Sequence, residues 1–205
     1  MIARVASYKM SFSTGGLFVN ESVELAGLHI TGENWSRTIL RALEHGATSL
    51  PKAASNRRTL REIGNRVSTL TDTEREFLVW GADRPEREAL LWLATCRAYR
   101  FIREFAIEVI QDRFLSYRLE LPLEAFDQFF EAKAEWDEGL AGLSVTTRVK
   151  LRQVLFRIMR EAGILDTSDH IRPALLSPRL TQLIVARRPE DLLCFPGQRL
   201  ETALS

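Results

Sequence analysis

The sequence holds few of the residues that mark disulfide-rich or metal-binding proteins. Its only two cysteines, Cys96 and Cys194, lie far apart in apolar stretches, and no CxxC or Cys/His spacing surrounds either of them. We therefore expect reduced, buried thiols in a cytoplasmic protein, with neither a disulfide nor a zinc site. Seven prolines among 205 residues, most of them near expected boundaries, leave room for long helices.

Long uninterrupted hydrophobic runs are also missing. The most apolar stretch, residues 89–110, contains five charged side chains: Arg97, Arg100, Arg103, Glu104 and Glu108. Five charges within one segment are costly in hydrocarbon, and polar residues near the N-terminus break any signal-peptide core. We expect a soluble cytoplasmic protein that has no membrane partner.

The chain has almost no net charge. Its 28 Lys and Arg residues face 27 Asp and Glu residues, which gives a formal net charge of +1. Any attraction to nucleic acid must therefore come from local patches. With 45% hydrophobic and 27% charged residues, the composition is that of an ordinary globular protein.

Catalytic signatures are lacking too. His29, His45 and His170 are scattered, and none has a neighbour at a metal-ligand spacing. The segment Ser13-Thr14-Gly15-Gly16 lacks the lysine and the preceding strand of a phosphate-binding P-loop, and no GxSxG turn occurs. The sequence predicts a protein that is not an enzyme and has no cofactor, metal or small-molecule substrate.

Helical periodicity runs through most of the chain and predicts a mainly α helical bundle. Residues 1–118 form a predicted N-terminal helical region, and residues 119–205 form a C-terminal region that is closely packed against it or joined with it in one globular unit. Asn20 and Thr71 are expected helix caps, the latter in a capping box with Glu74. Asp83 begins a predicted long central helix that continues through Phe114.

The stretch after Ser144 combines a core-facing stripe with a basic one. Its apolar residues recur every three or four positions: Leu151, Val154, Leu155, Ile158, Met159 and Ala162. At about 100° per residue, the opposite stripe collects cations and hydrogen-bond donors, with no acid directly within it: Thr146, Lys150, Gln153, Arg157 and Arg160. Such a row suits phosphates and base edges, although a basic outer face can also be simply solvated.

The residues that follow suggest a winged helix-turn-helix region with at most a small β-hairpin. Gly163 ends the basic helix, residues 166–169 form a polar turn, and residues 170–173 return as a short wing. Residues 126–136 would form the supporting helix, with Pro122 in its first turn, and residues 176–184 a closing helix capped by Ser177. The predicted DNA contacts are Thr146, Thr147, Arg148, Lys150, Arg152, Gln153, Arg157, Arg160 and Arg172.

Two further surfaces carry alternatives. Residues 56–66 hold a secondary basic patch, diluted by Glu62, that offers a face for RNA: Arg57, Arg58, Arg61 and Arg66. Residues 120–138 are acidic and favour a protein-interaction adaptor that holds partner subunits.

Several segments together resemble the BrxA family, a small component of BREX bacteriophage-exclusion systems. They are residues 11–17 followed by Glu21-Ser22, Trp35, residues 56–66, and residues 143–165 with Leu143-Ser144-x-x-Thr147. The likeness spans nearly the whole chain and consists of packing and capping patterns. It implies a bacterial cytoplasmic phage-defence protein that is helical, binds DNA and acts beside other BREX proteins. The family has also been compared with a helical RNA-binding antitermination factor.

Residue pattern and resemblance lead to one hypothesis. The chain is expected to be a DNA-binding accessory protein of a BREX system, contacting double-stranded DNA mainly through phosphates with little sequence preference. A protein-interaction adaptor of the defence complex and an RNA-binding protein remain the alternatives.

Overall fold

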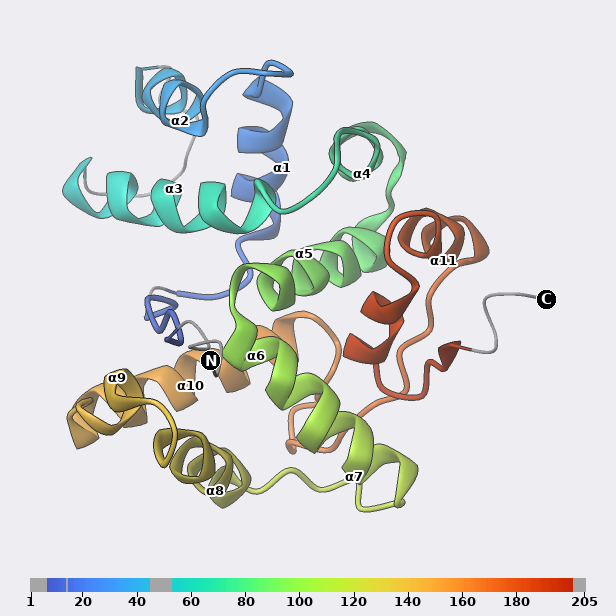
Figure 1. The fold of residues 1–205 in the computed structure, drawn as a ribbon. Helices are drawn as coiled ribbons and strands as arrows, with labels where there is room; N and C mark the ends of the chain where they lie inside the picture. The colour runs from blue at the N-terminus through green and yellow to red at the C-terminus, as the bar shows by residue number, and fades with distance from the viewer. Residues whose placement is uncertain (1–6, 14, 45–52, 201–205) are drawn as a thin grey trace, which may run out of the picture.

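Helices make up most of the chain in the computed structural model, which describes residues 7–13, 15–44 and 53–200 (Figure 1). The α-helices are α1 (Val19–Leu28), α2 (Trp35–Glu44), α3 (Ala53–Val67), α4 (Asp72–Glu76), α5 (Arg84–Ala98), α6 (Arg100–Phe105), α7 (Asp112–Leu115), α8 (Leu123–Ala134), α9 (Glu138–Ala141), α10 (Val145–Glu161) and α11 (Pro178–Val185). Two π-helical segments, η1 (Phe77–Gly81) and η2 (Ala106–Gln111), and the 3-10 helix η3 (Pro189–Cys194) join them. The predicted mainly helical fold is confirmed.

Side-chain caps explain where several helices begin. Thr71 accepts a hydrogen bond from the Glu74 N–H while the Glu74 carboxylate accepts one from the Thr71 N–H, so the predicted capping box is confirmed. Asp83 and Glu86 form a second box at α5. The predicted cap at Asn20 is wrong, because α1 already begins at Val19 after Phe18, whose φ is +56°.

The predicted long helix to Phe114 is broken at Tyr99. This residue has extended backbone angles (φ −129°, ψ 101°), so α5 ends at Ala98 and α6 leaves in a new direction. The break directs the buried Tyr99 hydroxyl toward α3, where it donates to the Glu62 carboxylate oxygens at 2.6 and 2.7 Å. This tertiary hydrogen bond overrides a helical preference that continues on both sides.

Aromatic rings fill the contact between α6, η2 and α8. Phe101 lies 5.1–5.9 Å from the ring centroids of Phe126, Phe129 and Phe130, in edge-to-face geometry, and Phe105 contacts the first two in the same way. All five side chains are buried. Edge-to-face pairs of this kind add about 0.5–1.5 kcal/mol each beyond the area that they bury.

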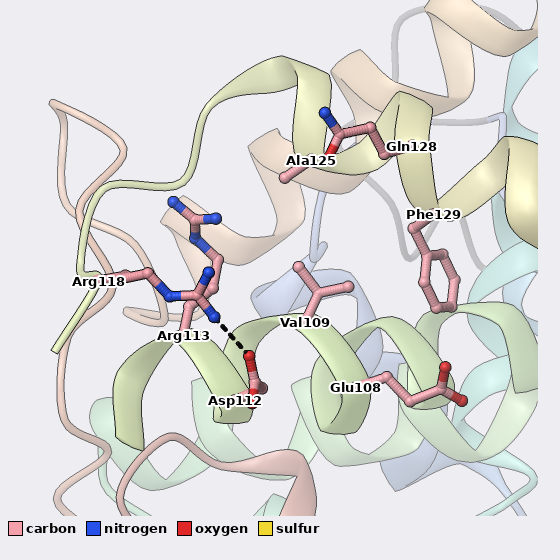
Figure 2. A pocket seen from close by; sticks show the side chains of 8 residues that line it. All are labelled: Glu108, Val109, Asp112, Arg113, Arg118, Ala125, Gln128 and Phe129. Atoms are coloured by element: carbon pink, nitrogen blue, oxygen red, sulfur yellow. Dashed lines mark hydrogen bonds and ion pairs between the residues drawn. The ribbon is translucent and has the colours of Figure 1, made fainter. Parts of the chain in front are cut away.

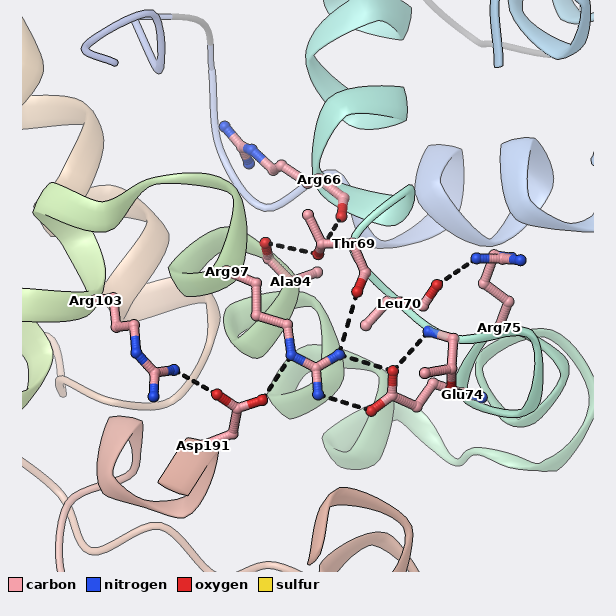
Figure 3. A network of polar contacts seen from close by, with 10 residues as sticks. Arg66, Thr69, Leu70, Glu74, Arg75, Ala94, Arg97, Arg103 and Asp191 are labelled. Carbon is pink, nitrogen blue, oxygen red and sulfur yellow. Dashed lines mark hydrogen bonds and ion pairs between the residues drawn. The ribbon is translucent and has the colours of Figure 1, made fainter. Parts of the chain in front are cut away.

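A buried ion network joins the C-terminal residues to the middle of the chain (Figure 3). Arg97 on α5 donates to both Glu74 oxygens, at 2.7 and 2.9 Å, and to Asp191 of η3, at 2.7 Å. Arg103 on α6 forms an ion pair with the second oxygen of Asp191. The nearby Trp92 indole N–H donates to the Cys194 carbonyl at 2.9 Å.

The described residues of the N-terminal segment, 7–13 and 15–17, lie between α3 and the α8–α10 region (Figure 1). The Tyr8 N–H donates to Asp137 at 2.9 Å. At the other end of the segment, Arg66 donates to the Gly16 carbonyl at 2.9 Å, and the Leu17 N–H donates to Glu161 at 2.5 Å. A Cβ at Gly16 would lie 2.1 Å from the Glu161 carboxylate, so a larger residue here would displace that side chain from the Leu17 N–H.

Three extended segments lie beside α8 and α10. The Ile171 N–H donates to the Leu119 carbonyl at 2.7 Å, and the Arg172 N–H donates to the Ile164 carbonyl at 2.9 Å. Within the described residues these segments form two isolated antiparallel bridges and no longer strand. Pro122 lies before α8 as its N-cap residue, and not in the first turn as predicted.

The predicted closing helix is α11, which begins with Ser177 as its cap and Pro178 at its first position. It is held on α5 through Glu86, which is buried. The Glu86 carboxylate accepts from the Ser177 hydroxyl at 2.5 Å and from Arg179 Nε at 2.6 Å. Hydrogen bonds from Arg179 foremost lower the pKa of Glu86 to about 2.

Asp191→Asn should lower the free energy of unfolding by about 3 kcal/mol, because removing one charge of a buried pair leaves Arg97 partly uncompensated. Urea unfolding followed by circular dichroism measures this. The control is Arg84→Gln, which removes an ion pair whose Arg84 side chain is 80% exposed and should cost less than about 1 kcal/mol. Equal losses for the two variants would contradict a stabilising network.

Glu86→Gln should alter the acid dependence of stability. The folded-state pKa of about 2 lies below the ordinary glutamate pKa of 4.5, so the ionised carboxylate stabilises the fold fully above pH 4.5 and loses that effect as the pH falls toward 2. The stability difference between the wild type and the variant should therefore be largest above pH 4.5 and shrink toward pH 2. A difference that does not change between pH 6 and pH 2.5, in urea titrations, would refute the assignment.

Candidate nucleic-acid interface

The rotation of α10 is fixed by its buried face. The helix begins at Ser144, whose hydroxyl accepts from the Thr147 N–H at 3.2 Å. Its fully buried side chains are Leu151, Leu155, Phe156, Ile158 and Met159. Because these residues face the core, the opposite side of the helix faces solvent.

That solvent face carries the five residues that the periodicity placed together: Thr146, Lys150, Gln153, Arg157 and Arg160. All five are exposed. They repeat at three- and four-residue intervals and so form a row along α10. The structure thus brings these five of the nine predicted contacts onto one surface.

Acidic neighbours reduce the charge of this row. Arg157 Nε lies 2.7 Å from Glu161 Oε1, and Arg160 donates to both Asp169 oxygens at 2.7 and 2.9 Å. The hydrogen bonds to Asp169 raise the pKa of Arg160. Lys150 alone among the cations of α10 has no ion-pair partner in the part of the chain that the structure describes. The sequence predicted a row without an acid, but Glu161 beside the row pairs with Arg157. The i,i+4 spacing of these two residues is visible in the sequence and could have revealed the pair.

The two arginines predicted to flank the row contact α8. Arg148 Nε lies 3.0 Å from Asp127, and Arg148 also donates to Glu131 at 2.9 Å. Arg152 forms an ion pair with the same Asp127. Half-buried Thr147 lies with its hydroxyl 2.9 Å from that of Ser144. The two arginines thus hold α10 against α8, whereas Thr147 contacts the cap of its own helix, and the role of all three residues toward DNA stays a prediction.

The turn predicted as a wing is acidic at its tip. Asp166 accepts from the Ser168 and His170 N–H groups at 2.8 and 3.0 Å, and these hydrogen bonds lower its pKa. Asp169 forms the pair with Arg160 described above. Arg172 is exposed on the returning segment. Arg172 is therefore the one predicted wing contact, and it lies beyond the tip.

The secondary basic patch is divided between surface and interior. Arg57, Arg58 and Arg61 are exposed on α3, whereas Arg66 is only 3% exposed. Arg66 pairs with the buried Glu62 at 2.8 Å and donates to the Gly16 carbonyl, so its expected place on the surface is wrong. Glu62, the acid within the predicted patch, is buried together with Arg66.

One pocket on the surface has balanced charges. A pocket of about 300 Å³ lies between η2, α7 and α8 (Figure 2), and its charged side chains are Glu108, Asp112, Arg113 and Arg118. Arg118 points toward Asp112 and donates to it at 2.8 Å. Two acids therefore oppose two bases at this pocket.

No group of three or more His, Cys, Asp or Glu side chains in the described ranges is placed to hold a metal ion. His29 stacks on Trp35 with ring centroids 3.9 Å apart. Burial is the main cause that lowers the pKa of His29. His45 lies outside the described residues. None of the described helices has the length and hydropathy needed to cross a membrane.

Comparison with known proteins shows similarity to a protein family, to a curated protein and to a solved structure. The family model BrxA matches residues 6–188. The BREX protein BrxA of Escherichia coli O9:H4 (strain HS) is 23% identical over 184 residues, which cover 87% of this chain and 84% of that protein. A crystal structure of an uncharacterized protein from Magnetospirillum magneticum is similar with a TM-score of 0.74 and 19% identity, over 93% of this chain and 98% of that one. The structural likeness bears on the fold alone.

Proposed function

Since this chain belongs to the BrxA family and is a component of a BREX antiviral defence system, we propose that its part in that system is to bind double-stranded DNA. The observation that carries the proposal is the exposed row on α10, from Thr146 to Arg160. The names of the family and of its curated member denote no enzymatic activity, and the proposed role is that of a non-enzymatic accessory protein.

The order of elements supports a winged helix-turn-helix arrangement for residues 100–172. A helical stretch, α6 to α7, precedes an extended segment, and α8, α9 and α10 follow before the last two extended segments. The bridges place residue 120 beside 170 and residue 165 beside 171. The segment with residues 170 and 171 therefore lies between the segment with residue 120 and the segment with residue 165. In winged domains this order presents the last helix to the major groove. We therefore assign α10 as the presented helix and α8 as its support.

The contacts would be made mainly to phosphates. Lys150 offers an unpaired ammonium, and Thr146 and Gln153 offer donors that reach phosphate oxygens as readily as bases. The pairs of Arg157 and Arg160 are at the surface, with side chains 62% and 40% exposed, and exposed pairs stabilise by less than about 1 kcal/mol. A phosphate can therefore replace either carboxylate. Such binding has little sequence preference and falls with salt.

The adaptor role is the second candidate, and one observation favours it. Trp136, which follows α8, is 88% exposed, and exposed tryptophan is enriched in protein interfaces. The acids of α8 speak against a free acidic docking face, because Asp127 and Glu131 already hold Arg148. An adaptor would co-purify with other BREX proteins and would not retain DNA.

Lys150→Gln/Arg157→Gln should weaken duplex binding, because two phosphate contacts are lost. Each lost contact should also make the negative slope of log K against log salt less steep by about 0.9. Fluorescence anisotropy with a labelled duplex at several salt concentrations measures both quantities. Glutamine at 157 keeps a donor for Glu161, which also accepts from the Leu17 N–H.

The matched control for this pair is Arg187→Gln/Arg188→Gln, which removes two exposed arginines outside the α8–α10 region. Unlabelled single-stranded DNA and RNA serve as competitors. Duplex affinity equal to that of the wild type in a folded Lys150/Arg157 variant, or preferential competition by RNA, would count against the proposal.

Asp127→Asn tests the neighbouring arginines. The substitution removes the ion-pair partner of Arg152 and one of the two partners of Arg148. If these side chains flank the DNA, the salt slope should steepen by about 0.9 for each one that reaches a phosphate. The control is Asp112→Asn, which also removes one ion-paired carboxylate, here an exposed one on α7. An unchanged slope in both variants would confine the interface to the row on α10.

A further inference from the structure

A pocket of about 600 Å³ lies between the N-terminal segment and α3. Lys9 and Ser13 line one wall, and Arg57, Arg58, Arg61 and Asn65 line the other. Contacts across the pocket fix its shape: Lys9 donates to the side-chain amide oxygen Oδ1 of Asn65, and Arg58 donates to the Ser13 hydroxyl at 3.0 Å. Its volume falls within the range of small-ligand sites.

The charge of this pocket is unbalanced. None of its four cations has an ion-pair partner among residues 7–13, 15–44 and 53–200, in contrast to the four paired arginines of α10. The single acid at its lining, Glu62, is buried and already accepts from Arg66 and Tyr99. The sequence around the pocket offers no other acid, because none occurs before Glu21 or between positions 45 and 61.

The arrangement of the arginines is unfavourable without a ligand. Arg57 and Arg61 are one helical turn apart, and like charges at this spacing destabilise a helix by about 0.2–0.5 kcal/mol. The amide nitrogen of Asn65 is buried and has no hydrogen-bond partner among the described residues. An unpaired donor thus accompanies the surplus of positive charge.

We propose that this pocket binds phosphate groups, with room for two neighbouring phosphates of a nucleotide or a nucleic-acid strand. Arginine forks bind phosphate oxygens in a bidentate manner, and the hydroxyls of Ser11 and Ser13 supply further donors. The described residues that line the pocket include no aromatic side chain, so recognition rests on phosphate charge and not on base stacking. The site is separate from α10 and does not depend on the proposed duplex binding.

Isothermal titration of the full chain with adenosine triphosphate, and separately with an eight-nucleotide oligothymidylate, tests the proposal. Arg57→Gln/Arg61→Gln should weaken binding by at least about ten-fold, because each charge-assisted hydrogen bond contributes about 1.5–3 kcal/mol. Binding of the triphosphate alone identifies a free nucleotide as the source of the phosphates, and binding of the oligonucleotide alone identifies a strand. Either result supports the pocket.

The matched control is Arg187→Gln/Arg188→Gln, which removes the same number of exposed charges from residues that do not line the pocket and should leave this binding unchanged. Circular dichroism melting verifies that both variants are folded. Absence of binding by either probe at low salt, or equal loss in both variants, would overturn the assignment. The two proposals can fail separately. Duplex binding is measured with the α10 variant, whereas phosphate binding in this pocket is measured with the α3 variant.

Discussion

The guanidinium of Arg97 is the point at which distant parts of this chain are held together. A buried cation is costly unless carboxylates surround it, and Glu74 and Asp191 meet that requirement from opposite sides. One of these acids also caps α4, and the other holds Arg103 of α6. The last described residues therefore lie on the central helices because of one charge that must be neutralised.

Local signals in the sequence predicted the beginnings of helices well. Caps such as Thr71 and Ser144 act within three residues of themselves, so their effect is visible without the fold. The exposed row on α10 followed from the period of its apolar residues for the same reason.

Features that depend on distant partners could not be predicted in this way. Tyr99 interrupts a helix because its hydroxyl meets Glu62, which is 37 positions away. Arg66 had the spacing of a surface cation, yet it is buried against Gly16, 50 positions earlier. Asp127 meets Arg152 only because α8 packs beside α10. In each case tertiary contact decides which charged groups remain available at the surface.

The carboxylate of Glu161 belongs to two surfaces at once. One oxygen holds Arg157 on the exposed row of α10, and the other accepts from the Leu17 N–H at the end of the N-terminal segment. That segment also supplies Lys9 and Ser13 to the basic pocket. If both surfaces bind phosphate as proposed, a phosphate that draws Arg157 away changes the charge near the Leu17 N–H, and so the energy of the segment. Occupancy of one surface would then shift the affinity of the other, and thermodynamic reciprocity requires the same factor in both directions.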